Sequence, residues 1–252
     1  MLDEQTLNRL RELGLKGMAE GYLSQREEGM RDLSFAERLG LLVDQEWIYR
    51  RNRTLARLLR EAKFRLPEAC LEDVDYAQPR GLDRHVLKDL ASGRFCHSHE
   101  NVLVVGPTGV GKTYVACAIG NAACRQGLRV RYLRVPRLLE DLRLARGDGT
   151  LSTRLRALAR TDLLILDDFG LAPLAPAEAR DLLEVVDERC LFRSTLLSSQ
   201  LPVEDWHATF ADPTTADAVL DRLVHNAHRL ILKGDSMRKV KHALMRREQE
   251  NE

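Results

Sequence analysis

The feature that most constrains this chain is a glycine-rich segment that follows a short apolar run. Residues 106–113 have the sequence Gly-Pro-Thr-Gly-Val-Gly-Lys-Thr, which fits the pattern G-x-x-x-x-G-K-[ST] of a phosphate-binding loop. Residues 102–105 are all apolar and predict a buried strand, and residues 114–124 predict a helix. The motif depends on a strand, a turn and a helix in this order. We therefore expect the chain to fold around a nucleotide-binding turn.

Each residue type in this loop has a physical reason. Gly106, Gly109 and Gly111 allow the backbone to curl so that its N–H groups point into one concavity. The helix that starts near Lys112 directs the positive end of its dipole at the same place. We expect Lys112 to bridge the β- and γ-phosphates and the Thr113 hydroxyl to bind Mg²⁺. The other expected nucleotide contacts are Pro107, Thr108, Val110 and Tyr114.

The composition is that of a folded chain without a marked charge bias. Of 252 residues, 44% are hydrophobic and 31% are charged, and the formal net charge is +1. This length fits one large domain or two smaller ones. No apolar run approaches the roughly 18 residues of a membrane span, and the charged N-terminus lacks the apolar stretch of a signal peptide. We expect a cytoplasmic protein with no membrane partner.

Arginine supplies most of the 39 basic residues. Its planar guanidinium binds phosphates in a bidentate manner, which favours a nucleic-acid partner. A GC-rich genome would also encode Arg in place of Lys, so the composition leaves both explanations open. The five cysteines are scattered along the chain and indicate no disulfide framework.

Residues 1–65 are expected to form a small helical domain. Ser34 and Glu37 have the spacing of a capping box that begins a long helix over 35–63. The second half of this helix is basic, either as a solvated surface or as a contact to DNA or another partner. The apolar stripe of the helix consists of Phe35, Leu39, Leu42, Val43, Trp47, Leu55, Leu58 and Leu59.

Helix-breaking residues separate this domain from the rest of the chain. Pro67 and the segment Pro79-Arg80-Gly81 predict a linker over 66–81. The second domain is expected over 82–252. The segment before the first strand commonly builds the base pocket in this architecture, so residues 80–96 are the expected site of the base.

The second domain alternates strands and helices. Strands are expected over 101–106, 129–135, 163–166, 194–199 and 229–232. Helices are expected over 112–126, 136–146, 151–160, 176–190 and 215–227. This alternation predicts an α/β fold with a parallel five-stranded sheet flanked by helices, which binds its ligand at the carboxyl ends of the strands. Along the chain, the strand over 129–135 lies between the loop strand and the third strand. An inserted strand at this point is typical of the additional-strand P-loop ATPases (AAA+).

Two acids follow the third strand directly. We expect Asp167 to hold Mg²⁺ through water and Asp168 to polarise the attacking water. The alternative is that the two acids merely begin a loop. Many relatives of this architecture have Glu at the second position, so the shorter Asp168 predicts slower hydrolysis. The guanine-specific sequence N-K-x-D is absent, which favours ATP.

Polar residues at three further positions are candidates for sensing the γ-phosphate: one after the fourth strand, and one on each side of the last strand. Gln200, with Ser199 as second choice, follows the fourth strand and could orient the water; the alternative is an ordinary polar strand end. Arg222 and Arg238 lie before and after the last strand and match an arginine finger and a second sensor. The alternative for each is a surface salt bridge. A finger that acts on a neighbouring copy implies a ring or helical filament with ATP at the subunit interfaces.

Taken together, five segments in order resemble the IstB family of AAA+ transposition helpers from bacterial insertion sequences. The segments are 106–113, 163–170, 199–202, 221–226 and 233–238. The family is similar to the helicase loader DnaC and, more distantly, to DnaA. The resemblance extends over nearly the whole chain, including the helical N-terminus around Ser34 and the segment 70–73.

The resemblance implies a function. ATP binding would drive self-assembly on double-stranded DNA, and the assembly would bend the DNA and recruit and stimulate an IstA-like DDE transposase. ATP hydrolysis would then remodel the complex. The resemblance assigns the phosphate and Mg²⁺ roles to Lys112 and Thr113, the acidic pair to Asp167 and Asp168, and the finger to Arg222. Alternatives are a DnaC-like loader of the replicative helicase and a nucleotide-regulated scaffold. A small-molecule kinase is disfavoured, because the sequence shows no segment that resembles a substrate lid.

Two basic regions are expected to contact the DNA backbone. One is the second half of the helix over 35–63. The other comprises Arg125, Arg129, Arg131, Arg134, Arg137, Arg143 and Arg146. Contacts to phosphates predict an affinity that falls steeply with salt and depends little on sequence.

Overall fold

The computed structural model describes residues 2–27, 32–76, 78 and 80–237, and the chain forms two compact units, 1–57 and 58–252. The boundary falls inside the long helix α3 (Phe35–Ala62). This division comes earlier in the chain than the expected domain limits at residues 65 and 81. The reason is packing: Ala69 and Val74 of the expected linker are buried, and Phe64 packs so closely against Gly120 that a Cβ there would lie 2.6 Å from the Phe64 ring.

The first unit consists of α1 (Leu2–Glu12), α2 (Lys16–Glu27) and the first part of α3. The expected capping box begins α3. The backbone N–H of Ser34 donates to Glu37 Oε2 at 2.8 Å, and the Glu37 N–H donates to Ser34 Oγ at 3.3 Å. The pair satisfies two helix N-terminal donors and lowers the pKa of the Glu37 carboxyl.

The expected apolar stripe of α3 is exposed over its first half. Phe35, Val43 and Trp47 are 73%, 53% and 59% exposed. The helix α2 covers the side of α3 that carries Leu42 and Gln45: a Cβ on Gly21 would lie 3.2 Å from the Leu42 side chain, and one on Gly17 would lie 2.6 Å from the carbonyl oxygen of Gln45. Helical spacing therefore identified Leu42 on the covered side, whereas Phe35, Val43 and Trp47 of the same stripe are exposed.

The second unit contains a parallel five-stranded sheet, which confirms the expected α/β AAA+ fold. The strand order is β2-β3-β4-β1-β5. The strands are β1 (Asn101–Val105), β2 (Val130–Arg134), β3 (Leu163–Phe169), β4 (Ser194–Ser199) and β5 (Ala227–Ile231). The two strands β3 and β4 separate β1 from β2, so the chain leaves the loop strand, crosses to the far edge of the sheet and then returns.

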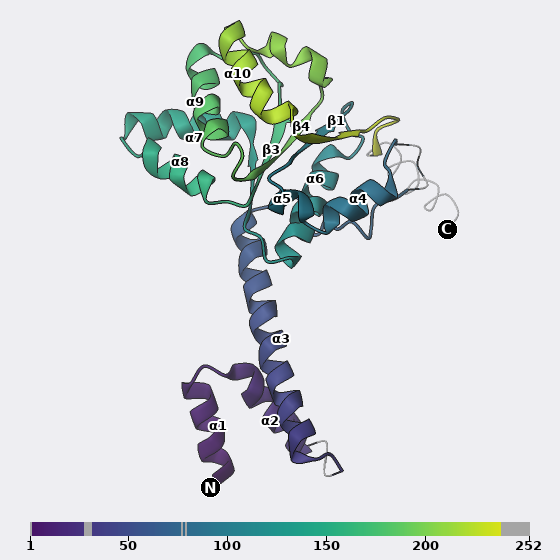
Figure 1. Ribbon diagram of the computed structural model, residues 1–252, viewed down its shortest axis with the longest axis vertical. Helices are drawn as coiled ribbons and strands as arrows, with labels where there is room; N and C mark the ends of the chain where they lie inside the picture. Colours follow the sequence, from purple (N-terminus) through teal and green to yellow (C-terminus); the bar gives the residue numbers. More distant parts are fainter. Residues whose placement is uncertain (1, 28–31, 77, 79, 238–252) are drawn as a thin grey trace, which may run out of the picture. The chain divides into compact units, whose positions relative to one another are not determined.

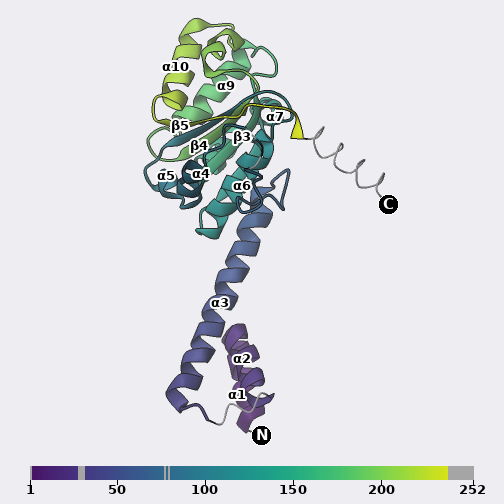
Figure 2. The ribbon, with the colours of Figure 1, turned by 90° about the vertical axis from the view of Figure 1, so that its right-hand side faces the viewer.

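Helices cover both faces of this sheet, as Figures 1 and 2 show. One face carries α4 (Arg84–Ala91) and α6 (Lys112–Arg125), and the other carries α7 (Val135–Gly147), α9 (Pro176–Asp187) and α10 (Pro213–Val224). In the part of this unit that the structure describes, the remaining helices are α5 (Arg94–His97), α8 (Leu151–Ala159) and the short η1 (Val203–Asp205) and η2 (His207–Thr209). Among the described residues, none of the helices combines the length and the apolar character that crossing a bilayer requires.

The strand β3 continues beyond its expected end at Leu166 and contains both acids. Its pairing with β4 shifts between Leu166 and Phe169, so the strand has an irregularity at the two acids. Asp168 has a left-handed backbone with φ of +62°, which Asp tolerates better than most residues. Irregularities of this kind redirect a side chain at the edge of a site. Here the side chains of Asp167 and Asp168 have different surroundings.

Candidate nucleotide-binding site

The glycine-rich loop lies at the carboxyl end of β1 and ends where α6 begins. Gly109 and Gly111 have φ of +89° and +103°, a region that residues with a side chain rarely adopt. A Cβ on Gly106 would collide with the carbonyl oxygen of Leu232. Two of these glycines therefore permit the turn, and the third permits close approach of the chain that follows β5.

The segment that follows β5 is hydrogen-bonded to the end of β1 and to the loop. The Leu232 N–H donates to the Val105 carbonyl at 2.8 Å, and the Met237 N–H donates to the Gly109 carbonyl at 2.9 Å. The buried Arg80 reaches the same loop, because its guanidinium donates to the Val110 carbonyl at 3.3 Å. None of these contacts was evident from the sequence, because each joins segments that are distant along the chain, 30 residues apart for Arg80 and Val110 and more than a hundred for the other two.

A pocket of about 540 Å³ opens beside the loop. Of the expected nucleotide residues, Thr108, Gly109, Gly111, Lys112, Thr113, Tyr114, Asp168 and Gln200 line it. The other lining residues are Arg65, Leu66, Asp73, Val74, Asp75, Arg80 and Met237. Residues 80–96 were expected to form the base site, but only Arg80 of that range lines the pocket. The segment 65–75 contributes five lining residues instead, because it belongs to the second unit and is not an extended linker.

Lys112 is held inside the loop. Its Nζ donates to the carbonyl oxygens of Gly106 at 2.7 Å and Pro107 at 2.8 Å. Burial lowers the pKa of Lys112 below 10.5, and the nearby carboxylates of Asp167 and Asp168 partly oppose this effect. A triphosphate would supply stronger acceptors and a compensating negative charge at the same position.

Asp167 is buried and accepts three side-chain hydrogen bonds. Thr113 Oγ1 donates at 2.9 Å, the Tyr132 hydroxyl donates at 2.6 Å, and Ser198 Oγ also donates. Burial and the bond to Asp167 raise the pKa of Tyr132, which keeps its hydroxyl protonated as a donor. The sequence analysis identified Thr113 and Asp167 but missed Tyr132 and Ser198, which lie on the two strands that flank β3.

These groups fit a magnesium ion bound together with a nucleotide. The Thr113 hydroxyl and the Asp167 carboxylate are adjacent, as expected from their roles. The described residues contain no group of three or more His, Cys, Asp or Glu side chains that could hold a metal alone. Mg²⁺ needs no such group, because it takes most of its ligands from phosphates and water.

Asp168 lies at the pocket, where two arginines neutralise it. Arg134 Nε donates to Asp168 Oδ2 at 2.6 Å, and an Arg65 guanidinium nitrogen lies 3.9 Å from the same oxygen. The Asp168 side chain is 18% exposed, and that of Arg134 is 49% exposed. The carboxylate expected to act on the attacking water is therefore already bound by two cations.

Gln200 and Ser199, the two candidates for orienting the water after the fourth strand, have different surroundings. Gln200 lines the pocket, and its Oε1 accepts a hydrogen bond from Thr108 Oγ1 at 2.6 Å. Ser199 is buried, and its hydroxyl donates to the Phe169 carbonyl at 2.9 Å. The geometry thus favours Gln200 for any role that touches the nucleotide.

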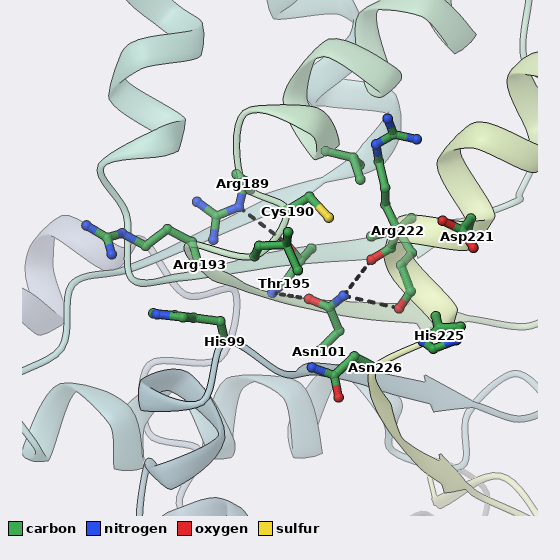
Figure 3. Close-up of a pocket in the computed structure, with 13 residues that line it drawn as sticks. His99, Asn101, Arg189, Cys190, Arg193, Thr195, Asp221, Arg222, His225 and Asn226 are labelled. Carbon is green, nitrogen blue, oxygen red and sulfur yellow. Dashed lines mark hydrogen bonds between the residues drawn. The ribbon is translucent and has the colours of Figure 1, made fainter.

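Arg222 lies at the opposite edge of the sheet from the loop. Asn101 is the first residue of β1, and its side-chain amide donates to the Arg222 carbonyl at 3.0 Å. The Arg222 guanidinium donates to Asp187 at 2.8 Å and lines a second pocket of about 250 Å³. Figure 3 shows Asn101 hydrogen-bonded toward both β4 and the end of α10, with the Arg222 side chain extending away from it. The other expected sensor, Arg238, lies outside the described residues.

A second arginine of this pocket has a different environment. Arg189 is 1% exposed and donates to the carbonyl oxygens of Leu158, Thr161 and Ser194 and to the Thr195 hydroxyl. Burial lowers the pKa of Arg189 to about 9. Three of its hydrogen bonds go to main-chain carbonyl oxygens, whereas the Arg222 guanidinium pairs with the exposed carboxylate of Asp187.

The seven arginines of the second region expected to contact DNA all have acceptors within the chain. They pair as Arg125 with Glu72 (2.7 Å), Arg129 with Asp162 (3.3 Å), Arg131 with the Glu61 carbonyl (3.0 Å), Arg134 with Asp168 (2.6 Å), Arg137 with Asp141 (3.1 Å), Arg143 with Glu140 (2.9 Å) and Arg146 with Asp181 and Glu184. DNA phosphates would have to compete with these acceptors.

Comparison with known proteins places these features in a family. The family described as IstB-like ATP binding protein matches residues 8–245. An insertion-sequence ATP-binding protein of Sinorhizobium fredii is 49% identical over 95% of this chain and 98% of its own length. An ATP-binding protein of insertion sequence IS21 from Pseudomonas aeruginosa is 35% identical over 93% of this chain and 88% of its own length.

Solved structures resemble about two thirds of this chain in fold. The DnaC helicase loader has a TM-score of 0.57 and 17% identity, covering 66% of this chain and 97% of the loader. DnaA from Aquifex aeolicus with bound AMPPCP has a TM-score of 0.56 and 20% identity, covering 69% of this chain and 53% of DnaA. At these identities, the comparison supports the AAA+ fold alone.

Proposed function

Since this chain belongs to the IstB-like ATP-binding protein family, we propose that it hydrolyses ATP at interfaces between copies assembled on double-stranded DNA. We further propose that this assembly recruits and stimulates an IstA-like DDE transposase. One observation carries the first proposal: the phosphate loop and Arg222 lie at opposite edges of one sheet. A single copy thus carries two incomplete halves of a hydrolytic site, which are complete only where copies meet.

The loop edge supplies the binding half. The loop amides and the α6 N-terminus would hold the phosphates, and Lys112 would exchange its loop carbonyl acceptors for phosphate oxygens. Thr113 and Asp167 would hold Mg²⁺, which offsets charge on the phosphates when bound. Tyr132 and Ser198 would orient Asp167 from both sides.

The hydrolytic step requires a water near Asp168. The water oxygen would form a bond to the γ-phosphorus while the bond from that phosphorus to the bridging oxygen of ADP breaks. Asp168 would accept the water proton, and Gln200 would orient the water. Arg222 of the neighbouring copy would stabilise the charge that develops on the γ-phosphate oxygens.

Contacts to DNA would come from the basic half of α3 and from the arginines of the second unit. Most of these arginines already pair with carboxylates at exposed positions, where ion pairs are weak and exchange readily. The phosphate backbone is a dense line of acceptors that would replace them, releasing counterions. Such binding positions the protein on DNA with little sequence preference.

The names of the relatives favour transposition over helicase loading. The relatives at 49% and 35% identity are named for insertion sequences. The helicase loader supports only the fold. A pull-down that returns the replicative helicase and no transposase would favour the loader instead.

The proposal is tested by assembly. The chain is mixed with plasmid DNA and ATP at low salt and examined by negative-stain electron microscopy and sedimentation. We expect ATP-dependent oligomers on the DNA, and none with Lys112→Ala, because its loop loses the phosphate-binding cation. Monomers that leave the plasmid bare with ATP would contradict the proposal.

A further inference from the structure

Two large apolar side chains lie next to each other on the turn between α9 and β4, at the amino edge of the sheet, where the strands begin. We infer that Leu191 and Phe192 are the apolar anchor by which one copy of this chain docks on the carboxyl edge of the next copy, where the strands end and the loop lies. The inference rests on the proposed function, because it names the contact that holds neighbouring copies together. It assigns this contact to side chains that neither bind nor cleave ATP.

The fold of a single copy leaves these two side chains in water. Leu191 is 76% exposed and Phe192 is 67% exposed. Single apolar side chains scattered over a surface are ordinary. An adjacent pair of this size is different, because the apolar area that a partner would remove from water is concentrated at one place. The turn is therefore a candidate for contact with another chain.

The backbone of the turn presents the pair in a fixed conformation. Leu191 has φ of +66°, in the left-handed region that glycine adopts freely and that large side chains rarely adopt. The Arg189 carbonyl closes the turn by accepting from the Phe192 N–H at 3.1 Å and from the Arg193 N–H at 2.9 Å. A Leu at a position that suits Gly indicates a use for the side chain itself, since Gly would fold there with less strain.

The buried Arg189 holds this turn in place from the inside. Its guanidinium donates to main-chain carbonyl oxygens on both sides of the turn, those of Leu158, Thr161 and Ser194. The turn is thus tied both to α8 and the residues after it and to the start of β4. An anchor that is already ordered loses less conformational entropy on binding than a mobile one, so this arrangement suits an interface.

The location of the pair favours a second copy as its partner. Leu191 lines the same pocket as Arg222, and Figure 3 shows Arg189, Cys190 and Arg222 around that pocket. Under the proposed function, Arg222 enters the nucleotide site of the neighbouring copy, beside its Asp168. Leu191 then comes close to the segment that follows Asp168 in that neighbour.

That segment carries a matching apolar side chain. Leu171 follows Asp168 by three residues and is 46% exposed. The charges of the two edges also fit each other. The amino-edge pocket is lined by one carboxylate, that of Asp221, and by the basic side chains of His99, Arg189, Arg193, Arg222 and His225. The carboxyl-edge pocket is lined by equal numbers of acidic and basic side chains, so a bound triphosphate makes it negative.

The first experiment measures ATP-dependent assembly on duplex DNA by sedimentation over a range of protein concentrations. Phe192→Ala should raise the concentration for half-maximal assembly about tenfold, as truncation of an aromatic anchor at an interface does. Leu191→Gly should raise it with no loss of thermal stability, because the strain that Gly relieves offsets the freedom that it adds to the unfolded chain. Leu13→Ala, at a position 72% exposed in the first unit, is the control and should behave like the unaltered chain.

The second experiment distinguishes the anchor from the finger. Turnover by Phe192→Ala should recover at high protein concentration, because a weakened interface fills by mass action and its catalytic groups are intact. Arg222→Ala should keep its low turnover at every concentration, because its interface lacks the cation that acts on the phosphate. Binding of a fluorescent ATP analogue to Phe192→Ala without DNA should be unchanged, since the substitution lies at the opposite edge from the loop.

A double-mutant cycle tests where the anchor docks. Leu171→Ala alone should raise the concentration for half-maximal assembly about threefold to tenfold. In the Phe192→Ala background it should add much less than it does alone, because the partner side chain is already gone. Independent effects that multiply would overturn the docking of the anchor beside Leu171.

The outcomes separate this inference from the proposed function. Normal assembly by both Phe192→Ala and Leu191→Gly overturns the inference and retains the proposed function. If these variants assemble normally but no longer stimulate a transposase, the pair belongs to that partner, and the inference fails as well. Equal weakening by Leu13→Ala shows a general effect of lost apolar surface and also overturns it. Failure of the unaltered chain to assemble with ATP and DNA overturns the proposed function together with the inference.

Discussion

The pockets at the two edges of the central sheet differ in how their charged side chains are hydrogen-bonded. At the carboxyl edge, the phosphate loop surrounds a cation, and a buried carboxylate receives three hydrogen bonds from three different elements. At the amino edge, Arg189 donates mainly to main-chain carbonyl oxygens, while the Arg222 guanidinium donates to Asp187 and to the Ala218 carbonyl of its own helix. The first edge is organised to receive a ligand, and the second holds an arginine that can leave its partner.

Under the proposed function, this difference is the reason that hydrolysis needs groups from both edges. Preorganised groups bind a triphosphate well, but the charge that develops during its cleavage needs a further cation. Arg222 cannot reach the loop of its own copy, because β1 runs from its edge to the loop edge. The contrast predicts that substitutions at the two edges fail in different ways.

The largest expected effect is on turnover. Arg222→Ala should lower the turnover number of the assembled protein about 1,000-fold, as removal of an arginine finger does, with ATP affinity unchanged. Steady-state turnover and fluorescent-nucleotide binding measure the two quantities. Mixing Arg222→Ala with Asp168→Asn, which keeps the phosphate-binding Lys112, should restore activity at interfaces that pair an intact Asp168 with an intact finger, roughly a quarter of the total on random mixing. No recovery would contradict action across copies.

The second effect separates the two arginines of the amino edge. Arg189→Met should lower the free energy of unfolding by about 3 kcal/mol, because several buried carbonyl oxygens lose their donor. Urea denaturation measures the change. Arg222→Ala, the matched control, should change stability by less than about 1 kcal/mol, since its ion pair is partly exposed. Similar losses from both substitutions would show that Arg222 is also structural.

The third effect tests the preorganisation of the carboxyl edge. Tyr132→Phe removes the buried hydroxyl that donates to Asp167 and should lower the free energy of unfolding by about 2 kcal/mol. The Mg²⁺ concentration needed for half-maximal ATP turnover should rise, because Asp167 loses an orienting partner. A stability loss without a change in Mg²⁺ dependence would limit Tyr132 to a structural role.

The smallest effect concerns pH. In the folded chain, the pKa of Lys112 is lowered below its ordinary value of 10.5. Between the lowered pKa and 10.5, Lys112 therefore binds more protons in the unfolded chain than in the folded one. Its contribution makes the free energy of unfolding rise with pH across that range. ATP favours the charged lysine and raises its pKa, so ATP affinity should fall roughly threefold as pH rises through the lowered pKa. Calorimetry in buffers of different ionisation enthalpy should detect proton uptake on binding in that range. Lys112→Arg should remove this pH dependence.

Local pattern was sufficient to predict much of the molecule. The loop over 106–113, the five strands and the acids after Leu166 follow from short-range composition, because strand burial and glycine-dependent turns depend on neighbours in sequence. The capping box at Ser34 and Glu37 is equally local and is confirmed. The sequence also carried the family resemblance, which the match over residues 8–245 confirms.

Only the tertiary structure decided which residues meet. Tyr132 and Ser198 flank Asp167 because β3 lies between β2 and β4, and no short-range pattern specifies that order. The same long-range pairing brings Arg134 to Asp168 and separates Arg222 from the loop by the length of β1. Hydrogen bonds and ion pairs depend on distance and angle in space, so the sequence alone determined the chemical groups of the site, and strand order determined their partners.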